Sequence, residues 1–211
     1  MQELFTIENI LVFVLCYVIG SIPTAYIIVK LKTNKDVTRE GSGNVGTLNS
    51  FQVTKSKSVG IAVLLIDLLK GAIPVYVIMH TFGYEYLTVM LGACAVILGH
   101  NYPVWLKFKG GRGLAPGAGL FLIINYYIVI GWCIVWLAVF IFKKSVLIAN
   151  TAATFSLPVL VILINFLDFA ELNQSVKGYG TLYFIVYSIL ITLIILSRHT
   201  EVFKGKVKKI N

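Results

Sequence analysis

Long apolar runs separated by short polar connections dominate the hydrophobic pattern of this 211-residue chain. About 20 apolar residues are enough for one helix to cross the hydrocarbon core of a bilayer. The pattern therefore predicts an all-α integral membrane protein that forms a single membrane domain over residues 1–211. The apolar runs cover residues 7–29, 59–79, 86–98, 114–142, 146–167 and 181–196.

The first run is interrupted by Gly20-Ser21-Ile22-Pro23 and is preceded by the acidic residues Glu3 and Glu8. A cleaved secretory signal has a positively charged segment before its apolar core and a small-residue cleavage site. Neither feature is clear here, so we expect the run to be a retained membrane helix.

The basic residues are distributed unevenly among the connections. Most of the 18 Lys and Arg residues lie in residues 30–57, 107–112, 143–144 and 198–209. Connections rich in Lys and Arg remain on the cytoplasmic side of a membrane. The other connections are acidic or nearly uncharged, so we expect the N-terminus outside and the C-terminus in the cytoplasm.

The run 114–142 has basic residues at both ends, Arg112 on one side and Lys143 on the other. A single helix would place these two residues on opposite sides of the membrane. We therefore expect the run to turn back at Asn125-Tyr126-Tyr127, because Asn favours turns. With this turn, the run crosses the membrane twice, and the predicted number of transmembrane helices is about seven.

Composition agrees with a membrane protein, with 58% hydrophobic and 13% charged residues and a mean hydropathy of +0.87. These values exclude an ordinary soluble globule and a disordered chain. The net charge of +9 follows from the basic connections, so we expect no nucleic acid as a partner. Three cysteines lie in apolar runs without metal-ligand spacing, which favours buried apolar roles: Cys16, Cys94 and Cys133.

A glycine-rich segment lies in the first basic connection: Gly41-Ser42-Gly43-Asn44-Val45-Gly46, followed by Asn49. Glycines allow positive φ angles, and successive backbone N–H groups in such turns can bind an anion. A flexible tight loop between helices is the alternative. The segment is not a dinucleotide fingerprint, because no βαβ unit surrounds it.

A second segment combines glycines with cations: Gly99-His100-Asn101-Tyr102-Pro103, then Lys109-Gly110-Gly111-Arg112-Gly113. Lys or Arg beside exposed backbone suits a phosphate dianion. Anchoring at lipid headgroups is the alternative, which we favour for Trp105 and Lys107. His100 is either a ligand-binding residue or a structural hydrogen-bonding residue.

Four further polar residues are candidates. Asp67 and Lys70 are three residues apart inside an apolar helix, where ionisable groups are functional candidates and where an ion pair can also fix helix packing. Ser145 can cap the following helix or donate to a bound phosphate. His199 has a pKa range that suits proton transfer, although a plain surface histidine is the alternative.

Together these motifs resemble the acyl-phosphate-dependent glycerol-3-phosphate acyltransferases of bacterial membranes (PlsY type). The resemblance covers almost the whole chain and rests on segments in the family's order: 20–23, 41–49, Asp67-Leu68-Leu69-Lys70-Gly71, 99–113, Ser145 and Arg198-His199. It implies a multi-pass protein of the bacterial plasma membrane with its site facing the cytoplasm.

The resemblance implies transfer of a fatty acyl group from acyl phosphate to the sn-1 hydroxyl of glycerol 3-phosphate, giving lysophosphatidic acid. It implies no metal or other cofactor, and no obligate protein partner is evident. The catalytic candidates are His199, Ser145 and Asn44. The substrate-binding candidates are Ser42, Gly43, Asn49, His100, Lys109, Gly110, Gly111, Arg112 and Gly113. We expect Ser42, Lys109, Arg112, Ser145 and His199 to converge on one ligand.

The chain departs from the family's pattern at polar positions. Gln52 stands where the family has Arg, Arg112 where it has Lys, Pro116 where it has Thr, and Val202 where it has Asn. The alternative is therefore a paralogue with an altered acceptor, or one that binds an anionic lipid or phosphate metabolite without catalysis. A small transporter is a third reading, which the apolar character of the mid-membrane positions disfavours.

Overall fold

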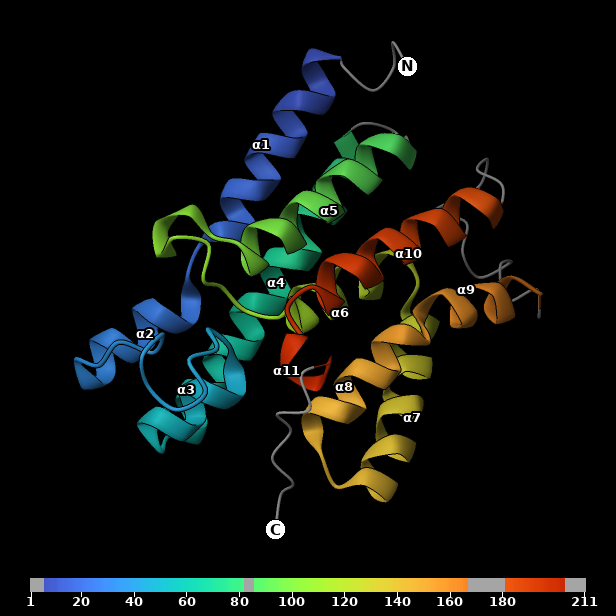
Figure 1. Ribbon diagram of the computed structural model, residues 1–211. Helices are drawn as coiled ribbons and strands as arrows, with labels where there is room; N and C mark the ends of the chain where they lie inside the picture. Colours follow the sequence, from blue (N-terminus) through green and yellow to red (C-terminus); the bar gives the residue numbers. More distant parts are fainter. Residues whose placement is uncertain (1–5, 82–85, 167–180, 204–211) are drawn as a thin grey trace. The chain divides into compact units, whose positions relative to one another are not determined.

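The computed structural model describes residues 6–81, 86–166 and 181–203, and every regular element in these ranges is helical (Figure 1). The chain divides into two compact units, one ending at Leu120 and one beginning at Phe121. We describe each unit by itself. The prediction of a single membrane domain stays a prediction.

The described residues of the first unit form α1 (Ile7–Ser21), α2 (Thr24–Thr33), α3 (Thr47–Thr54), α4 (Lys57–Thr81), α5 (Tyr86–Asn101), the 3₁₀ helix η2 (Val104–Leu106) and the start of α6 (Leu114–Ile124). The second unit contains α7 (Tyr126–Lys143), α8 (Val146–Phe155), α9 (Leu157–Phe166), α10 (Thr181–Leu196) and α11 (Thr200–Phe203).

Among the described residues, four helical stretches are long and apolar enough to cross a membrane: 7–33, 57–81, 86–106 and 126–143. A fifth candidate consists of α8 and α9, which are bent by 45° relative to one another. Two shorter apolar helices cover 114–124 and 182–196. The chain is thus a multi-pass membrane protein. The count of seven crossings and the orientation of the termini remain predictions.

Two predicted helix breaks are confirmed. Helix α1 ends at Ser21, and Pro23, which has no N–H to donate, precedes α2. The long run 114–142 breaks at Asn125, whose side chain caps α7 by accepting a hydrogen bond from the Tyr127 N–H at 3.0 Å.

The run 146–167 differs from the expected single helix, because it is divided at Ser156 between α8 and α9. Pro158 cannot donate the helical hydrogen bond that the Thr154 carbonyl would receive. The Thr192 hydroxyl of α10 donates to that carbonyl at 3.4 Å instead. Proline thus explains the bend that the apolar pattern alone did not predict.

Helices α1 and α5 pack at close range through glycines. A Cβ atom on Gly20 would overlap the Val96 carbonyl, and one on Gly99 would overlap the Tyr17 carbonyl. The Tyr17 hydroxyl also donates to the Tyr102 carbonyl at 2.8 Å. This packing fixes the Pro23 break beside the C-terminal end of α5.

A small apolar core holds the connection between α2 and α3 in place. Val37 and Val45 of this connection are buried together with residues of α2 and α4: Ala25, Val29, Val59 and Val63. The glycine-rich segment is therefore anchored at Val45 and is not a freely flexible loop.

Candidate functional site

The first glycine segment forms a tight turn that only glycine fits. Gly41 and Gly43 have φ angles of +59° and +71°, in the left-handed region where other residues are strained. A Cβ atom on Gly41 would also overlap the Asn49 side chain. Gly46 differs from the expectation of a positive φ, since it is extended at −158° and precedes α3.

The side-chain amide of Asn49 organises this turn from inside. Asn49 is almost fully buried, with 1% of its surface exposed. Its Nδ2 donates to the carbonyls of Val37, Glu40 and Asn44 at 3.0–3.1 Å, and its Oδ1 accepts from the Ser42 N–H at 2.9 Å. Asn49 therefore positions the segment, and its polar atoms are already engaged within the protein.

The start of the connection is held by Asp36. Its Oδ1 accepts from the Thr38 N–H at 2.9 Å and from the Thr38 hydroxyl at 2.7 Å. These hydrogen bonds lower the pKa of Asp36 below its ordinary value. Asp36 consequently remains an anion at neutral pH and stabilises the turn.

The second segment folds back on the C-terminal end of α5. The Gly110 N–H donates to the Asn101 carbonyl and the Gly111 N–H to the His100 carbonyl, at 3.2 and 3.0 Å. A Cβ atom on Gly110 would overlap the His100 carbonyl, and one on Gly111 would overlap the His100 ring. These glycines permit the close approach, and Gly113 adds a positive φ of +79°.

The backbone N–H groups expected to bind an anion are largely occupied. Those of Ser42, Gly110 and Gly111 donate as described, the Gly43 N–H donates to the Glu40 carbonyl, and the Asn44 N–H donates weakly to the Ser42 hydroxyl. These five N–H groups are thus engaged within the protein, and anion binding by the remaining backbone of the segments stays a prediction. The glycines serve the shape of both segments, and side chains are left as the main candidates to contact a phosphate.

A buried charge cluster joins two residues of α4 to His100 of the second segment. The Lys70 Nζ is 2.9 Å from the Asp67 Oδ1 and donates to the Ile22 carbonyl at 3.0 Å. The His100 Nδ1 is 3.9 Å from the same Asp67 oxygen. All three side chains are buried. The predicted Asp67–Lys70 pair is confirmed, and sequence spacing gave no signal for its contact with the α1–α2 break.

One small cavity connects this cluster with both glycine segments. It has a volume of about 10 Å³ and is lined by Val45 from the first segment, by His100 and Pro103 from the second, and by Asp67 and Lys70. Ser21 and Thr24 also line it, and their buried hydroxyl oxygens lack a hydrogen-bond partner within the described residues. A cavity of this size holds about one water molecule.

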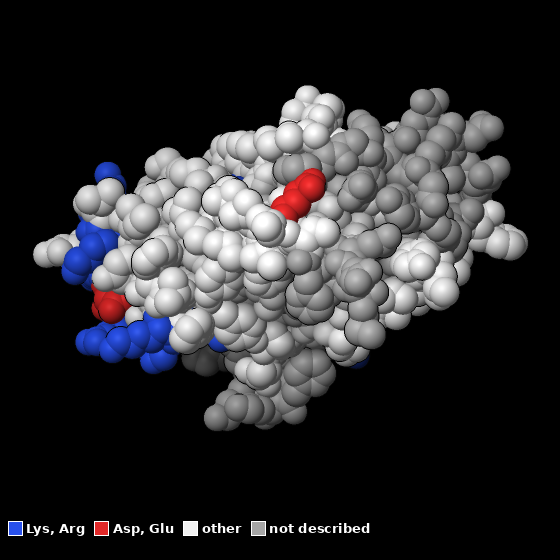
Figure 2. All heavy atoms as spheres, turned by 90° about the horizontal axis from the view of Figure 1, so that it is seen from above, with Lys and Arg blue, Asp and Glu red and all other residues white. Residues whose placement is uncertain are grey.

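The polar side chains of the two segments differ in exposure. Ser42 and Lys109 are exposed, whereas Asn44 and Arg112 are half-buried. Other exposed cations occupy the same connections, including Lys35, Arg39 and Lys55. In Figure 2, the Lys and Arg side chains on the face shown gather at one end, while the surface beside them is mostly uncharged.

Two predicted catalytic residues lie in the second unit. Ser145 is buried and caps α8 by accepting from the Ile148 N–H at 3.4 Å, which confirms the capping role. His199 is fully buried, and its Nδ1 lies 2.9 Å from the Ile195 carbonyl, so a plain surface histidine is excluded. Whether Ser145 and His199 meet Ser42, Lys109 and Arg112 remains a prediction.

The described residues contain no group of three or more His, Cys, Asp or Glu side chains that could hold a metal ion. The chemistry of the described site is that of cations, hydroxyls, amides and a buried ion pair. Such a set suits the binding of phosphate groups.

Comparisons with known proteins are consistent with a site that binds phosphate groups. The family described as glycerol-3-phosphate acyltransferase matches residues 10–209. The chain is 33% identical to the glycerol-3-phosphate acyltransferase of Ehrlichia canis over 94% of its own length and 97% of the relative's. It is 47% identical to glycerol-3-phosphate acyltransferase 2 of Lactobacillus johnsonii, in a match that spans about half of that protein, 54%.

A solved structure has the same fold over nearly its whole length. It is the crystal structure of PlsY, an integral membrane glycerol 3-phosphate acyltransferase, in its glycerol 3-phosphate form, with a TM-score of 0.79, 28% identity and 96% of each chain covered. The lysophosphatidic acid form of PlsY gives a TM-score of 0.77. The family match, the similar relatives and the shared fold agree with the sequence motifs. The chain therefore belongs to the glycerol-3-phosphate acyltransferase family.

Proposed function

We propose that this protein transfers a fatty acyl group from acyl phosphate to the sn-1 hydroxyl of glycerol 3-phosphate, producing lysophosphatidic acid and inorganic phosphate. The observation that carries the proposal is the cavity lined by both glycine segments, in a membrane protein of this family. The similar PlsY structures are described as glycerol 3-phosphate and lysophosphatidic acid forms, which supports the acceptor and the product.

The reaction replaces one acyl–oxygen bond with another. The sn-1 oxygen attacks the carbonyl carbon of the acyl phosphate, and the bond from that carbon to the phosphate oxygen breaks. Phosphate leaves with the electron pair, and the hydroxyl proton passes to a base or to a phosphate oxygen. The protein must therefore hold two phosphate groups near each other and place the hydroxyl within about 3–3.5 Å of the carbonyl carbon.

Side chains of the two segments are suited to the phosphate groups. Lys109 and Arg112 supply cations, and Ser42 and Asn44 supply hydroxyl and amide groups. Charge-assisted hydrogen bonds of this kind are about twice as strong as neutral ones. Asn49, Gly110 and Gly111 act indirectly in this proposal, because they hold the shape of the segments.

The proposal assigns roles in the second unit to Ser145 and His199. A buried histidine near a backbone carbonyl has one ring nitrogen oriented by that contact. The other nitrogen can then accept or donate a proton. In the proposed reaction, His199 orients or deprotonates the acceptor, glycerol 3-phosphate. The Ser145 hydroxyl donates a hydrogen bond to the phosphate group of that acceptor.

The finer features of the topology belong to the same proposal. Seven crossings, an outside N-terminus and a cytoplasmic site in the bacterial plasma membrane follow from the basic connections at 30–57 and 107–112. This orientation would place the site in reach of the water-soluble acceptor and of the lipid donor.

The test is incubation of the purified protein with hexadecanoyl phosphate and labelled glycerol 3-phosphate. We expect labelled lysophosphatidic acid. Arg112→Ala should lower its formation by at least tenfold, because a charge-assisted hydrogen bond contributes about 1.5–3 kcal/mol, and Arg112→Lys should recover part of it. Activity of Arg112→Ala equal to that of the unchanged protein would remove Arg112 from the phosphate site.

The altered residues favour a second candidate, a paralogue that binds a phosphate compound without transfer. Gln52 is exposed on α3, where the family's pattern has Arg. Pro116 lies in the first turn of α6, where proline is tolerated, but it lacks a hydroxyl. If the unchanged protein is inactive and Gln52→Arg with Val202→Asn gains turnover, this second candidate is correct.

A further inference from the structure

The His100 ring lies between helix α4 and the second glycine segment. His100 belongs to the last turn of α5 and is buried, with 7% of its surface exposed. Its Nδ1 is 3.9 Å from the Asp67 Oδ1 of α4. Its Nε2 faces Gly111, where a Cβ atom would overlap that nitrogen. One buried ring thus separates a carboxylate from the backbone that carries Arg112.

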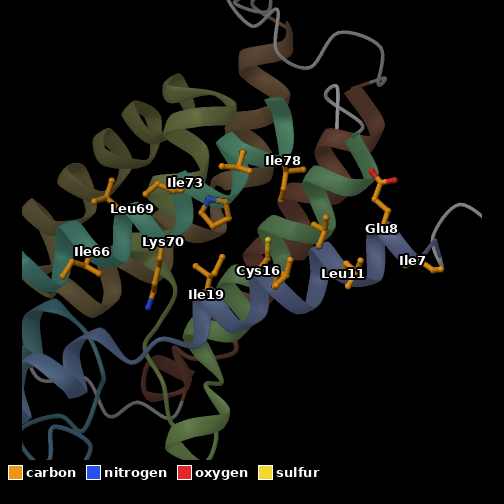
Figure 3. Close-up of a pocket in the computed structure, with 14 residues that line it drawn as sticks. Ile7, Glu8, Leu11, Cys16, Ile19, Ile66, Leu69, Lys70, Ile73 and Ile78 are labelled. Atoms are coloured by element: carbon orange, nitrogen blue, oxygen red, sulfur yellow. The ribbon is translucent and has the colours of Figure 1, made fainter. Parts of the chain in front are cut away.

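Lys70 fixes the carboxylate that faces this ring. The Lys70 side chain reaches from α4 to the α1–α2 break (Figure 3), where its Nζ donates to the Ile22 carbonyl at 3.0 Å. The same Nζ is 2.9 Å from the Asp67 Oδ1. The separation of Asp67 and His100 is longer than a direct hydrogen bond, and the small cavity that both side chains line has room for one bridging water molecule.

Helix α4 also supports the chain beyond Arg112. A Cβ atom on Gly71 would overlap the Pro116 carbonyl at the start of α6. On the other side of Arg112, the Gly111 N–H donates to the His100 carbonyl at 3.0 Å. The backbone on each side of Arg112 therefore packs against a fixed neighbour. A shift of the His100 ring would move Gly111 and, with it, the attached Arg112.

We propose that His100 is a positioning residue, which Asp67 and Lys70 orient and which sets the place of the Arg112 guanidinium through Gly111. This inference rests on the proposed function, in which Arg112 binds a phosphate group. It predicts that His100 affects substrate binding only as long as Arg112 is present.

The first test is a double-variant cycle that combines His100→Leu with Arg112→Ala. Leucine fills about the volume of the ring but has no nitrogen to face Asp67. The cycle is measured as KM for glycerol 3-phosphate and for hexadecanoyl phosphate. We expect His100→Leu to raise the KM of the same substrate as Arg112→Ala does, by at least about fivefold, and to add less than about twofold when Arg112→Ala is already present. Independent, multiplying effects of the two changes would overturn the positioning role.

The matched control for this cycle is Thr88→Val. Thr88 is buried on the same helix α5, and its hydroxyl donates to the Asn9 side chain at 2.8 Å. Its loss should lower the temperature of thermal unfolding and leave both KM values unchanged. A rise of KM in Thr88→Val equal to that in His100→Leu would show that any loss of packing in α5 has this effect, and would refute a specific role of His100.

The second test separates positioning from stability. The double variant Asp67→Asn with Lys70→Met has no buried charge, so its thermal unfolding should be close to that of the unchanged protein. His100 nevertheless lacks the carboxylate that orients it. We expect KM to rise as it does in His100→Leu, again only while Arg112 is present. Recovery of both stability and KM would contradict the inference.

These measurements distinguish the inference from the proposed function. If the unchanged protein forms no lysophosphatidic acid, the proposed function fails, and the same cycle is measured as the dissociation constant of glycerol 3-phosphate by ligand-observed NMR. Absence of binding to the unchanged protein would overturn both. If lysophosphatidic acid is formed while His100→Leu and Arg112→Ala act independently, the positioning role fails alone.

Discussion

At the scale of single residues, the buried Asp67–Lys70 pair is the most demanding feature of the first unit. Both residues belong to the apolar helix α4, and the Lys70 Nζ is 2.9 Å from the Asp67 Oδ1. Charges in such surroundings are costly unless they are paired and hydrogen-bonded. The Ile22 carbonyl, left at the end of α1 by the Pro23 break, accepts a further hydrogen bond from Lys70.

Removing one member of this pair should destabilise the protein strongly. Asp67→Asn leaves the Lys70 ammonium without its counter-ion, and we expect a loss of about 3–5 kcal/mol in unfolding free energy. Thermal unfolding in detergent measures it. The double variant Asp67→Asn with Lys70→Met removes both charges and should recover most of the loss. If Asp67→Asn unfolds like the unchanged protein, the pair does not stabilise the first unit.

Glycine at position 110 is required for the close approach to α5. Gly110→Ala would force a methyl group into the His100 carbonyl, and backbone cannot move aside as a side-chain end can. We expect lysophosphatidic acid formation to fall at least about tenfold, with an overpacking cost of about 1–3 kcal/mol in stability. Gly131→Ala is the control, because its methyl group would meet only the flexible end of Leu160. Equal activities of both variants would contradict this role.

The sequence was sufficient to identify these polar residues but not their partners. The spacing of Asp67 and Lys70 predicts that they face each other, because it is a local property of one helix. Their contacts with Ile22 and His100 depend on how α1, α4 and α5 pack, which no local pattern contains. Gly20 and Gly99 permit the close packing of α1 and α5. Their positions in the sequence do not show which helices they bring together.

At the scale of elements, the glycine turn before α3 depends on one buried amide. The Asn49 side chain donates to three carbonyls and accepts from one N–H of the turn. The substrate-binding role expected for Asn49 stays a prediction, and the structure adds that its amide is hydrogen-bonded within the turn. A side chain's direction, inward or outward, is fixed by the path of the turn, so residue type alone could not decide it.

Asn49→Ala should therefore lower both stability and activity. It leaves buried carbonyl groups without donors, at a cost of about 2 kcal/mol or more, and frees the turn that carries Ser42 and Asn44. Circular dichroism during thermal unfolding measures the stability. Gln52→Ala, exposed on the same helix, should change it by less than about 0.5 kcal/mol. Unchanged stability of Asn49→Ala would refute the positioning role.

The helix breaks illustrate what the apolar pattern can and cannot predict. Asn125 was found because charges flanked its run on both sides, and it caps α7. The bend before Pro158 was missed because the surrounding run is uniformly apolar. Proline is a local signal for such a bend, while the Thr192 hydroxyl that compensates it comes from α10.

At the scale of the whole molecule, orientation in the membrane follows from the unequal distribution of positive charge. We expect a cysteine introduced at Gln2 of a variant without native cysteines to react with a membrane-impermeant maleimide in intact spheroplasts. A cysteine at Lys35 should react only after the membrane is permeabilised, because residues 30–57 carry the basic charge. The reverse pattern of labelling would invert the proposed topology.

The most direct test of the central claim compares acyl donors for the purified protein with labelled glycerol 3-phosphate. Hexadecanoyl phosphate should give lysophosphatidic acid and inorganic phosphate in equal amounts, and hexadecanoyl-CoA at the same concentration should give neither. No product from hexadecanoyl phosphate, while an active member of the family makes it in parallel, would contradict the assignment of acyltransferase activity to this protein.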